Sequence, residues 1–170
     1  MKARLALALG AIVSTAAAAY DGRASGLGVG AFIPSGDLED TNDTSWYLQA
    51  RTVFAREVFG GRAGVYYGDT TAHGAIDGGR AFGFDVEGLA RFGRRETFGY
   101  VFAGAGYGRA TFTRPGPLSG SFVRSSEWDW TLQGGAGIVI KRRVYLEAMY
   151  LQYQTDPKSS FIPVVIGFQY

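Results

Sequence analysis

The stretch 126–140, SEWDWTLQGGAGIVI, alternates between two kinds of side chain at every second position. One set is mostly bulky and apolar: Trp128, Trp130, Leu132, Ala136, Ile138 and Ile140. The other set is polar or small: Glu127, Asp129, Thr131, Gln133, Gly135 and Gly137. Because successive side chains of a β-strand point to opposite faces, this spacing predicts a strand with one apolar wall and one polar or cramped wall.

The same period recurs along the chain and predicts eight strands, at 25–34, 45–56, 61–70, 80–92, 98–113, 126–140, 143–155 and 161–170. The connections alternate between long (35–44, 71–79 and 114–125) and short (56–61, 93–97 and 141–143). An even number of long strands, with long loops at one end and tight turns at the other, is typical of outer-membrane barrels. The expected fold is therefore all-β, an eight-stranded antiparallel up-and-down transmembrane β-barrel.

The first residues predict export. A basic start (Lys2 and Arg4) precedes an uncharged apolar run and an A-x-A pattern ending at Ala19, which is typical of a signal peptide over 1–19 followed by a barrel domain over 20–170. Without Lys2 and Arg4, the 17 basic residues fall to 15 and balance the 15 acidic ones, which gives no argument for nucleic-acid binding. The chain has no Cys, so its stability must come from strand pairing and packing.

Alternation alone does not say which face meets lipid, and a soluble secreted barrel with an apolar interior is the alternative. Charged and amide side chains of the polar face can pair across a narrow lumen, whereas Arg or Lys facing lipid near the midplane would cost about 2–4 kcal/mol each. We therefore predict a lumen filled by side chains, with a polar network of Gln49, Arg51, Arg62, Asp85, Glu87, Glu127, Asp129, Gln133 and Glu147.

Aromatic residues near the strand ends support the same orientation, since membrane barrels carry aromatic girdles at both interfaces. At the turn side we predict Phe54, Phe92, Phe98, Phe168 and Tyr170, and at the loop side Trp46, Tyr67, Phe82, Trp128, Trp130, Tyr150 and Tyr153. Glycines within the strands are expected to relieve crowding in the lumen. The predicted strands 98–113 and 143–155 have an ambiguous phase. In the first we predict an outward set of Val101, Ala103, Ala105 and Tyr107, and in the second an outward set of Leu146, Ala148 and Tyr150.

The chain closes with IPVVIGFQY (162–170), in which Ile162, Val164, Ile166, Phe168 and Tyr170 form the expected outward set. Gly167, Phe168 and Tyr170 resemble the C-terminal signal by which the outer-membrane assembly machinery recognises barrels, with Tyr in place of the commoner Phe. The chain resembles the OmpA-like and OmpX-like small barrels over nearly all of its mature length, without the peptidoglycan-binding domain of OmpA. The resemblance implies a fold, an outer-membrane location with both mature termini in the periplasm, and an assembly route, but no reaction.

No sequence feature requires catalysis or a cofactor. The only histidine, His73, lies in a loop among small residues, and no serine stands in a fixed strand relation to it. The acidic loop with Asp37, Glu39, Asp40 and Asp43 offers clustered oxygen ligands for a divalent cation, such as one that bridges lipopolysaccharide phosphates. Its spacing does not match a calcium loop, so a solvated charged loop is the favoured interpretation. We expect no metal, no cofactor and no nucleic acid. The expected partners are outer-membrane lipid and lipopolysaccharide, the assembly machinery and periplasmic chaperones.

The functional prediction is a small, monomeric, non-enzymatic outer-membrane barrel with a structural or surface-interaction role through its loops. Two alternatives remain open at this point. Glycines at inward positions would permit a narrow porin-like channel for small solutes, and some barrels of this size modify lipid A.

Overall fold

The computed structural model describes residues 23–39, 42–56, 58–72, 79–93, 96–115, 122–155 and 159–170. The predicted signal peptide (1–19) and His73 lie outside these residues.

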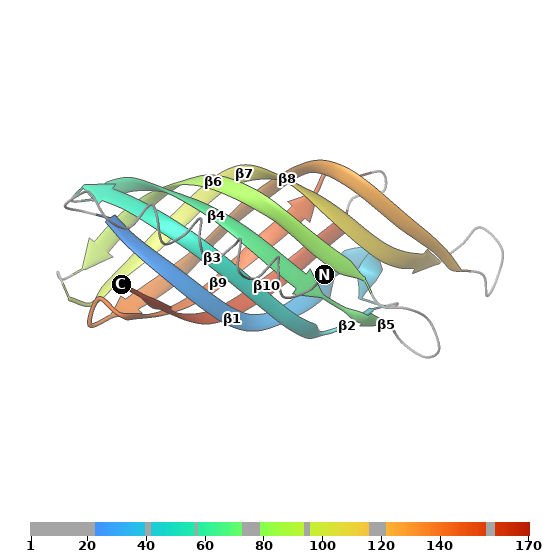
Figure 1. Ribbon diagram of the computed structural model, residues 1–170, viewed down its shortest axis with the longest axis horizontal. Coiled ribbons are helices and arrows are strands. Elements are labelled where there is room, and N and C mark those ends of the chain that lie inside the picture. The colour runs from blue at the N-terminus through green and yellow to red at the C-terminus, as the bar shows by residue number, and fades with distance from the viewer. Residues whose placement is uncertain are drawn as a thin grey trace, which may run out of the picture.

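Eight strands form one closed antiparallel barrel, which confirms the predicted fold (Figure 1). In chain order they are β1 (Arg23–Ser35), β3 (Ser45–Arg56), β4 (Phe59–Asp69), β6 (Arg80–Gly93), β7 (Phe98–Pro115), β8 (Phe122–Ile140), β9 (Val144–Tyr153) and β10 (Ser159–Gln169). Each pairs with its neighbours in the chain, and β1 also pairs with β10. The predicted boundaries differ most at β8, which begins four residues before the predicted start at 126, because its pairing with β7 continues from Phe98↔Val139 to Pro115↔Phe122.

The seam between β1 and β10 closes the barrel. It runs from Gly26↔Gln169 to Ser35↔Ser160, and Ser25 and Tyr170 exchange two further backbone hydrogen bonds of 2.9 and 2.8 Å. Both edges of each of the eight barrel strands are therefore paired, which removes the exposed edges that would otherwise attract other chains.

A small cap covers the loop end of the barrel. The 3₁₀ turn η1 (Gly36–Leu38) places Leu38, 1% exposed, in the core, and a short ribbon joins β2 (Asn42–Asp43) to β5 (Thr71–Ala72). Thr70 ties the two loops together: its hydroxyl donates to Asn42 Oδ1 at 3.2 Å and accepts the Gly79 N–H at 2.8 Å. The sequence predicts only loops at 35–44 and 71–79, so the cap is an addition to the predicted fold.

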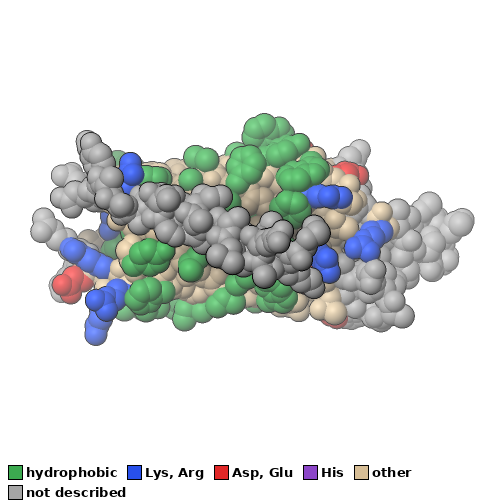
Figure 2. Space-filling model, viewed as in Figure 1, with side chains coloured by type: hydrophobic (Ala, Val, Ile, Leu, Met, Phe, Trp, Pro, Cys, Tyr) green, Lys and Arg blue, Asp and Glu red, His purple; other side chains and the backbone are tan. Residues whose placement is uncertain are grey.

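The outer wall is apolar, as predicted. Large apolar side chains with exposures such as 64% for Val86, 62% for Trp130 and 52% for Leu132 point away from the axis. Figure 2 shows such side chains spread along the wall, with Lys and Arg gathered toward the two ends. Among the described residues, no helix is long and apolar enough to cross a bilayer.

The burial pattern also settles the two ambiguous phases. Val101, Ala103 and Ala105 in β7 are exposed and Tyr107 is half-buried, while Leu146, Ala148 and Tyr150 in β9 are exposed, as preferred from the sequence. Two residues assigned to the aromatic girdles are instead inside. Tyr153 is fully buried, and Phe98 packs against the core, because each shares its strand face with lumenal residues such as Tyr100 and Met149.

Candidate functional site: the barrel lumen

Lumenal glycines make room for lumenal tyrosines. A Cβ on Gly83 or Gly108 would lie 2.6 or 2.7 Å from the Tyr66 hydroxyl, and one on Gly28 or Gly167 would collide with the Tyr145 ring. Large and small residues therefore alternate between neighbouring strands, as expected where eight strands enclose a space just wide enough for side chains. This confirms the predicted role of glycine inside the strands.

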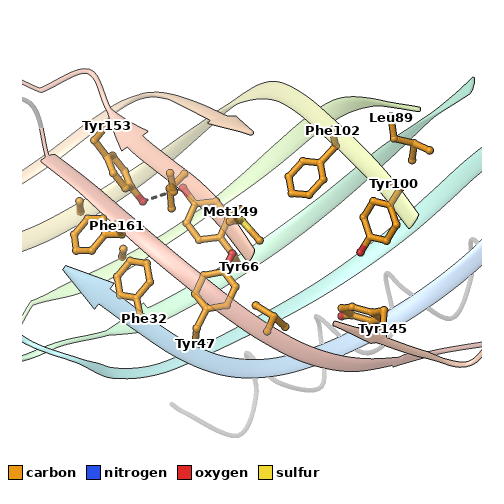
Figure 3. Packing of buried hydrophobic residues seen from close by; sticks show 14 of the residues in the cluster. Phe32, Tyr47, Tyr66, Leu89, Tyr100, Phe102, Tyr145, Met149, Tyr153 and Phe161 are labelled. Carbon is orange, nitrogen blue, oxygen red and sulfur yellow. Dashed lines mark hydrogen bonds between the residues drawn. The ribbon is translucent and has the colours of Figure 1, made fainter. Parts of the chain in front are cut away.

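We call the part of the lumen nearest the long loops the loop half; aromatic rings fill it. Phe32 stacks on Phe161 with ring centroids 4.2 Å apart and on Tyr47 at 5.5 Å, and Tyr47 stacks on Tyr66 at 6.1 Å. The hydroxyls of Tyr66 and Tyr153 are hydrogen-bonded at 2.9 Å. Figure 3 shows these rings gathered on one side of the cluster, apart from Tyr100 and Tyr145. With Leu38 above them, they leave the loop half closed.

A layer of buried ion pairs, which we call the ionic layer, lies next to the aromatic rings. Glu147 accepts hydrogen bonds from Arg51, from Arg62 Nη1 at 2.5 Å and from the Tyr100 hydroxyl at 2.6 Å. Arg62 also binds both carboxylate oxygens of Glu87. The side chains of these two arginines and two glutamates are at most 4% exposed, so each charge depends on its partners rather than on water.

Aromatic rings flank the two arginines of the ionic layer. Arg51 Cζ lies 3.6 Å from the Tyr145 ring centroid, and Arg62 Cζ lies 3.6 Å from that of Phe102. Guanidinium groups stack well on aromatic faces, which adds to the ion pairs. The cavity beside this layer, lined by Gln49, Asp85 and Met149 among others, has a volume of only about 10 Å³. The ionic layer is thus closely packed.

Beyond the ionic layer, toward the tight turns, the lumen opens into a cavity of about 1040 Å³, which we call the vestibule. Its described lining is mixed: it has apolar side chains such as Val53, Leu89 and Val139, and five arginines, Arg23, Arg51, Arg62, Arg91 and Arg142. The expectation that side chains fill the whole lumen is therefore wrong for this turn half. Leu89, Tyr100 and Val139 belong both to this lining and to the buried core cluster.

The predicted polar network lies only partly in the ionic layer. Arg51, Arg62, Glu87 and Glu147 form the ion pairs, and Gln49 donates to the Tyr145 hydroxyl at 3.2 Å. Gln133 is buried, and Asp85 is half-buried over Gly64.

Two predicted members of the network lie away from that layer. Glu127 is exposed, and half-buried Asp129 accepts the Trp130 N–H at 2.7 Å. Both residues have the inward phase of β8 but stand near its loop end, beyond the enclosed part of the lumen.

Sequence reasoning missed the tyrosine partners of the ionic layer. Tyr145 stands two residues before Glu147 and therefore shares its face, a signal that was available. The vestibule arginines were also missed, because Arg91 and Arg142 border turns in which a charge is unremarkable. The acidic loop gives no metal site among the described residues, but the side chain of Asp37 and all of Asp40 lie outside them.

The proposed assembly signal occupies the seam. Phe168 and Tyr170 point outward with exposures of 50% and 61%, and Gly167 faces inward against Tyr145. The close approach of the Tyr145 ring therefore explains why residue 167 is glycine, independently of any recognition by the assembly machinery.

Fold and surface together define the class, a small eight-stranded β-barrel of the outer-membrane type. No family model matches the chain, and no curated protein matches it in sequence. Solved structures share its fold. Ail of Yersinia pestis is 15% identical, with 89% of this chain and 100% of that chain covered and a TM-score of 0.56.

Two further structures have the same architecture. Neisserial surface protein A is 13% identical, with 88% of this chain and 96% of that one covered and a TM-score of 0.57. The outer membrane enzyme PagL is 14% identical, with 86% and 97% covered and a TM-score of 0.50. Since one of these barrels is an enzyme, the shared fold does not decide between a catalytic and a non-catalytic role.

Proposed function

We propose that the chain is a non-enzymatic protein of the bacterial outer membrane with a structural or surface-interaction role through its loops. The observation that carries this proposal is the closed lumen. The aromatic rings of the loop half and the ionic layer leave no wide path along the axis, while the outer wall is apolar around the barrel. Because packed side chains occupy the interior, interactions with other molecules would take place at the ends of the barrel.

Membrane insertion is tested by single cysteine labels, since the chain has no other cysteine. A nitroxide at Leu132, which points outward, is expected to report acyl chains, as judged by relaxation with oxygen. A nitroxide at exposed Arg143, in the β8–β9 turn, is the matched control and is expected to report water. Water at Leu132 would favour a soluble barrel instead.

The channel alternative is tested by conductance in planar bilayers. We expect no discrete openings, because the ionic layer and the aromatic rings stand in series along the axis. The double variant Phe32→Ala and Tyr47→Ala enlarges the loop half and serves as a positive control. Stepwise conductance from the unmodified chain would overturn the closed-lumen proposal.

The enzyme alternative is tested on the substrate that such a barrel would meet. Incubation with lipopolysaccharide, followed by mass analysis of the acyl chains, is expected to show an unchanged pattern. The only histidine, His73, lies outside the described residues, so a His73→Ala variant is the informative comparison. A change in acylation that this variant abolishes would show catalysis.

The expected lipid partners have a fitting surface near the loop end of the wall. Trp128 stacks on Tyr107 at 5.7 Å and meets Phe82 edge-on at 5.2 Å, and Tyr107 also contacts Trp130 at 5.5 Å. Arg109 lies opposite Trp128 on β7 and donates from Nε to Ser126 Oγ at 3.0 Å. Aromatic rings beside a cation suit the headgroup level of lipid or lipopolysaccharide.

Export through a signal peptide, both mature termini in the periplasm, and delivery by chaperones to the assembly machinery complete the proposal. Phe168→Ala with Tyr170→Ala is expected to reduce the amount of protein recovered in the outer membrane, because these side chains would carry the recognition signal. Leu146→Ala, another outward position on the neighbouring strand, is the control.

A further inference from the structure

Cations at the loop end of the outer wall are gathered on one side of the barrel. Of the Arg and Lys side chains that the structure describes, those at this end are Arg80, Arg109 and Arg124, which have the outward phase of β6, β7 and β8. Near the loop ends of β3 and β4, the outward residues include Trp46 and Asp69 instead. We call the outward loop-end surface of β6, β7 and β8 the basic sector; the residues that matter here are Arg80, Phe82, Tyr107, Arg109, Trp128 and Trp130.

Arg109 offers free hydrogen-bond donors at the centre of the basic sector. It is exposed, and its Nε donates to Ser126 Oγ at 3.0 Å, while the Thr111 hydroxyl lies 2.8 Å from the same oxygen. No described residue accepts a hydrogen bond from its two Nη groups, and it takes part in none of the ion pairs among the described residues. Ser126 therefore orients the planar guanidinium group and leaves both Nη groups for a ligand.

Carboxylates on the neighbouring strands do not share the face of Arg109. Its cross-strand partners are Phe82 on β6 and Trp128 on β8. Glu127 and Asp129 have the inward phase of β8, on the opposite face of the sheet. Asp69, the cross-strand partner of Arg80, stands two strands away on β4. On the outer face, Arg109 is therefore the cation of the basic sector that has aromatic rings, and no described carboxylate, as its cross-strand partners.

Aromatic rings lie beside Arg109 and on the side of it that faces the middle of the wall. Trp128 and Trp130 are 50% and 62% exposed, and Tyr107 stacks on Trp128 at 5.7 Å and meets Trp130 at 5.5 Å. An exposed indole has an apolar face and one N–H donor, so it can cover the C–H face of a sugar ring and donate to a hydroxyl. The three strands together span about 10 Å, which is wide enough for two linked sugar rings.

We propose that the basic sector binds the phosphorylated sugar headgroup of lipopolysaccharide, with a phosphate on Arg109 and a sugar ring on Trp128 or Trp130. The inference rests on the proposed function, because the loop end must face the leaflet that contains lipopolysaccharide. Arginine suits this ligand because its planar fork of donors matches phosphate oxygens. The acyl chains of the same lipid would lie along exposed apolar residues nearer the middle of the wall, such as Val86 and Leu132.

The opposite side of the wall supplies an internal contrast. Trp46 stacks on Tyr67 at 5.0 Å and is 43% exposed, so aromatic rings are present there too. Asp69 has the same outward phase of β4 as Tyr67, two residues away, and its carboxylate would repel a phosphate. Lipopolysaccharide should therefore prefer the basic sector to the surface around Trp46.

The test follows the fluorescence of Trp128 and Trp130 in a Trp46→Phe chain, where they are the only tryptophans. The full-length barrel is reconstituted in phosphatidylcholine that is brominated near the headgroup end of its chains and quenches an indole in contact with it. Diphosphorylated lipid A then replaces part of this lipid, and a preferred site restores fluorescence at lower mole fractions than dilution alone. We expect lipid A to be preferred at least about tenfold, the effect of one additional charge-assisted hydrogen bond.

Variants and lipids identify the source of the preference. Arg109→Gln should lower it at least about fivefold, whereas Arg143→Gln, which removes the same charge at an exposed position of the turn end, should leave it within about twofold. Lipid A without phosphates should show little preference, and phosphatidylglycerol, which is anionic but has no sugar, should restore less fluorescence than lipid A. A chain with Trp128→Phe and Trp130→Phe, in which Trp46 is the reporter, should show no preference for lipid A.

The outcomes separate this site from the proposed function. If brominated phosphatidylcholine does not quench the tryptophans at all, the barrel is not in the bilayer, and both the proposed function and the site are overturned. Normal quenching overturns the site alone if the preference for lipid A is equal at Trp46, is unchanged in Arg109→Gln, or is matched by phosphatidylglycerol. The comparison of lipid A with and without phosphates uses no substitution at Arg109, so it tests the site even if Arg109→Gln fails to fold.

Discussion

The loop half and the turn half of the lumen differ in how far side chains fill them. In the loop half, rings from β1, β3, β4, β9 and β10 meet and exclude space, with Phe32 between Tyr47 and Phe161. In the turn half, the lumen opens into the vestibule, whose lining mixes apolar side chains with arginines. The ionic layer separates the halves. The comparison teaches that stacked rings close one half of the barrel, while the other half keeps open space at the turn end.

The largest effect is expected at the boundary between the halves. Glu147→Ala leaves Arg51 and Arg62 buried without their shared carboxylate, which should cost about 3–5 kcal/mol of unfolding free energy. Urea-induced unfolding in lipid vesicles measures the loss. Asp85→Ala removes a half-buried carboxylate that belongs to no ion pair of the layer and should cost far less; an equal loss would contradict the assignment of Glu147 as the shared partner.

The next effect compares a large deletion among the stacked rings with a small deletion on the vestibule wall. Phe32→Ala opens a space within the stacked rings and should cost about 3 kcal/mol. Val53→Ala, on the vestibule wall, removes a side chain that already borders open space and should cost about 1 kcal/mol. The same unfolding measurement serves both variants. Similar losses would mean that the halves are packed alike.

A smaller effect is expected from added atoms. Gly68→Ala places a Cβ 2.8 Å from the Phe32 ring and should cost about 1–3 kcal/mol through overpacking. Gly88 points outward, and a Cβ there meets nothing closer than the Ala103 carbonyl at 4.0 Å. Gly88→Ala should therefore be nearly neutral. If both variants unfold at the same urea concentration, the loop half has room that the structure does not show.

The smallest effect is a gain. Replacing Lys141 and Arg142 by Asn and Gly supplies residues that favour positive φ in a tight hairpin, and should stabilise the barrel by about 1 kcal/mol. Urea-induced unfolding in lipid vesicles measures the gain. An unchanged or lowered midpoint would mean that the positive φ at Lys141 and Arg142 costs the barrel little.

The sequence predicts the fold well because strand phase is a local property. Alternation in 126–140 places Trp130 outward and Gln133 inward without knowledge of any other strand. It also predicts the ion-pair residues, since Arg51, Arg62, Glu87 and Glu147 are charges on otherwise inward faces. Their pairing depends on register between strands that are distant in the chain, and register cannot be read from one strand alone.

The errors have a similar cause. Tyr153 and Phe98 stand near strand ends, where a girdle residue and a lumenal residue differ only in which face of the strand they occupy. Their place near the strand end suggests a girdle position, but the alternation of their strands places both inside. The vestibule is a space that the side chains leave empty. Its presence depends on the sizes and positions of side chains on many strands together, which no single stretch of sequence gives. Neither the loop cap nor the positive φ at Lys141 and Arg142 has a signature in the residue types themselves.

The seam joins strands that lie at opposite ends of the polypeptide, and its ladder resembles the other seven. The structure of the closed barrel therefore does not distinguish the pairing of the first and last strands from the other pairings. A circularly permuted gene that links residue 170 to residue 23 and starts at the turn between β8 and β9 should give the same ring. The pairing of β8 with β9 would then be the one that closes the barrel. If insertion depends on strand order, the insertion rate of the permuted chain would change while its final architecture would stay the same.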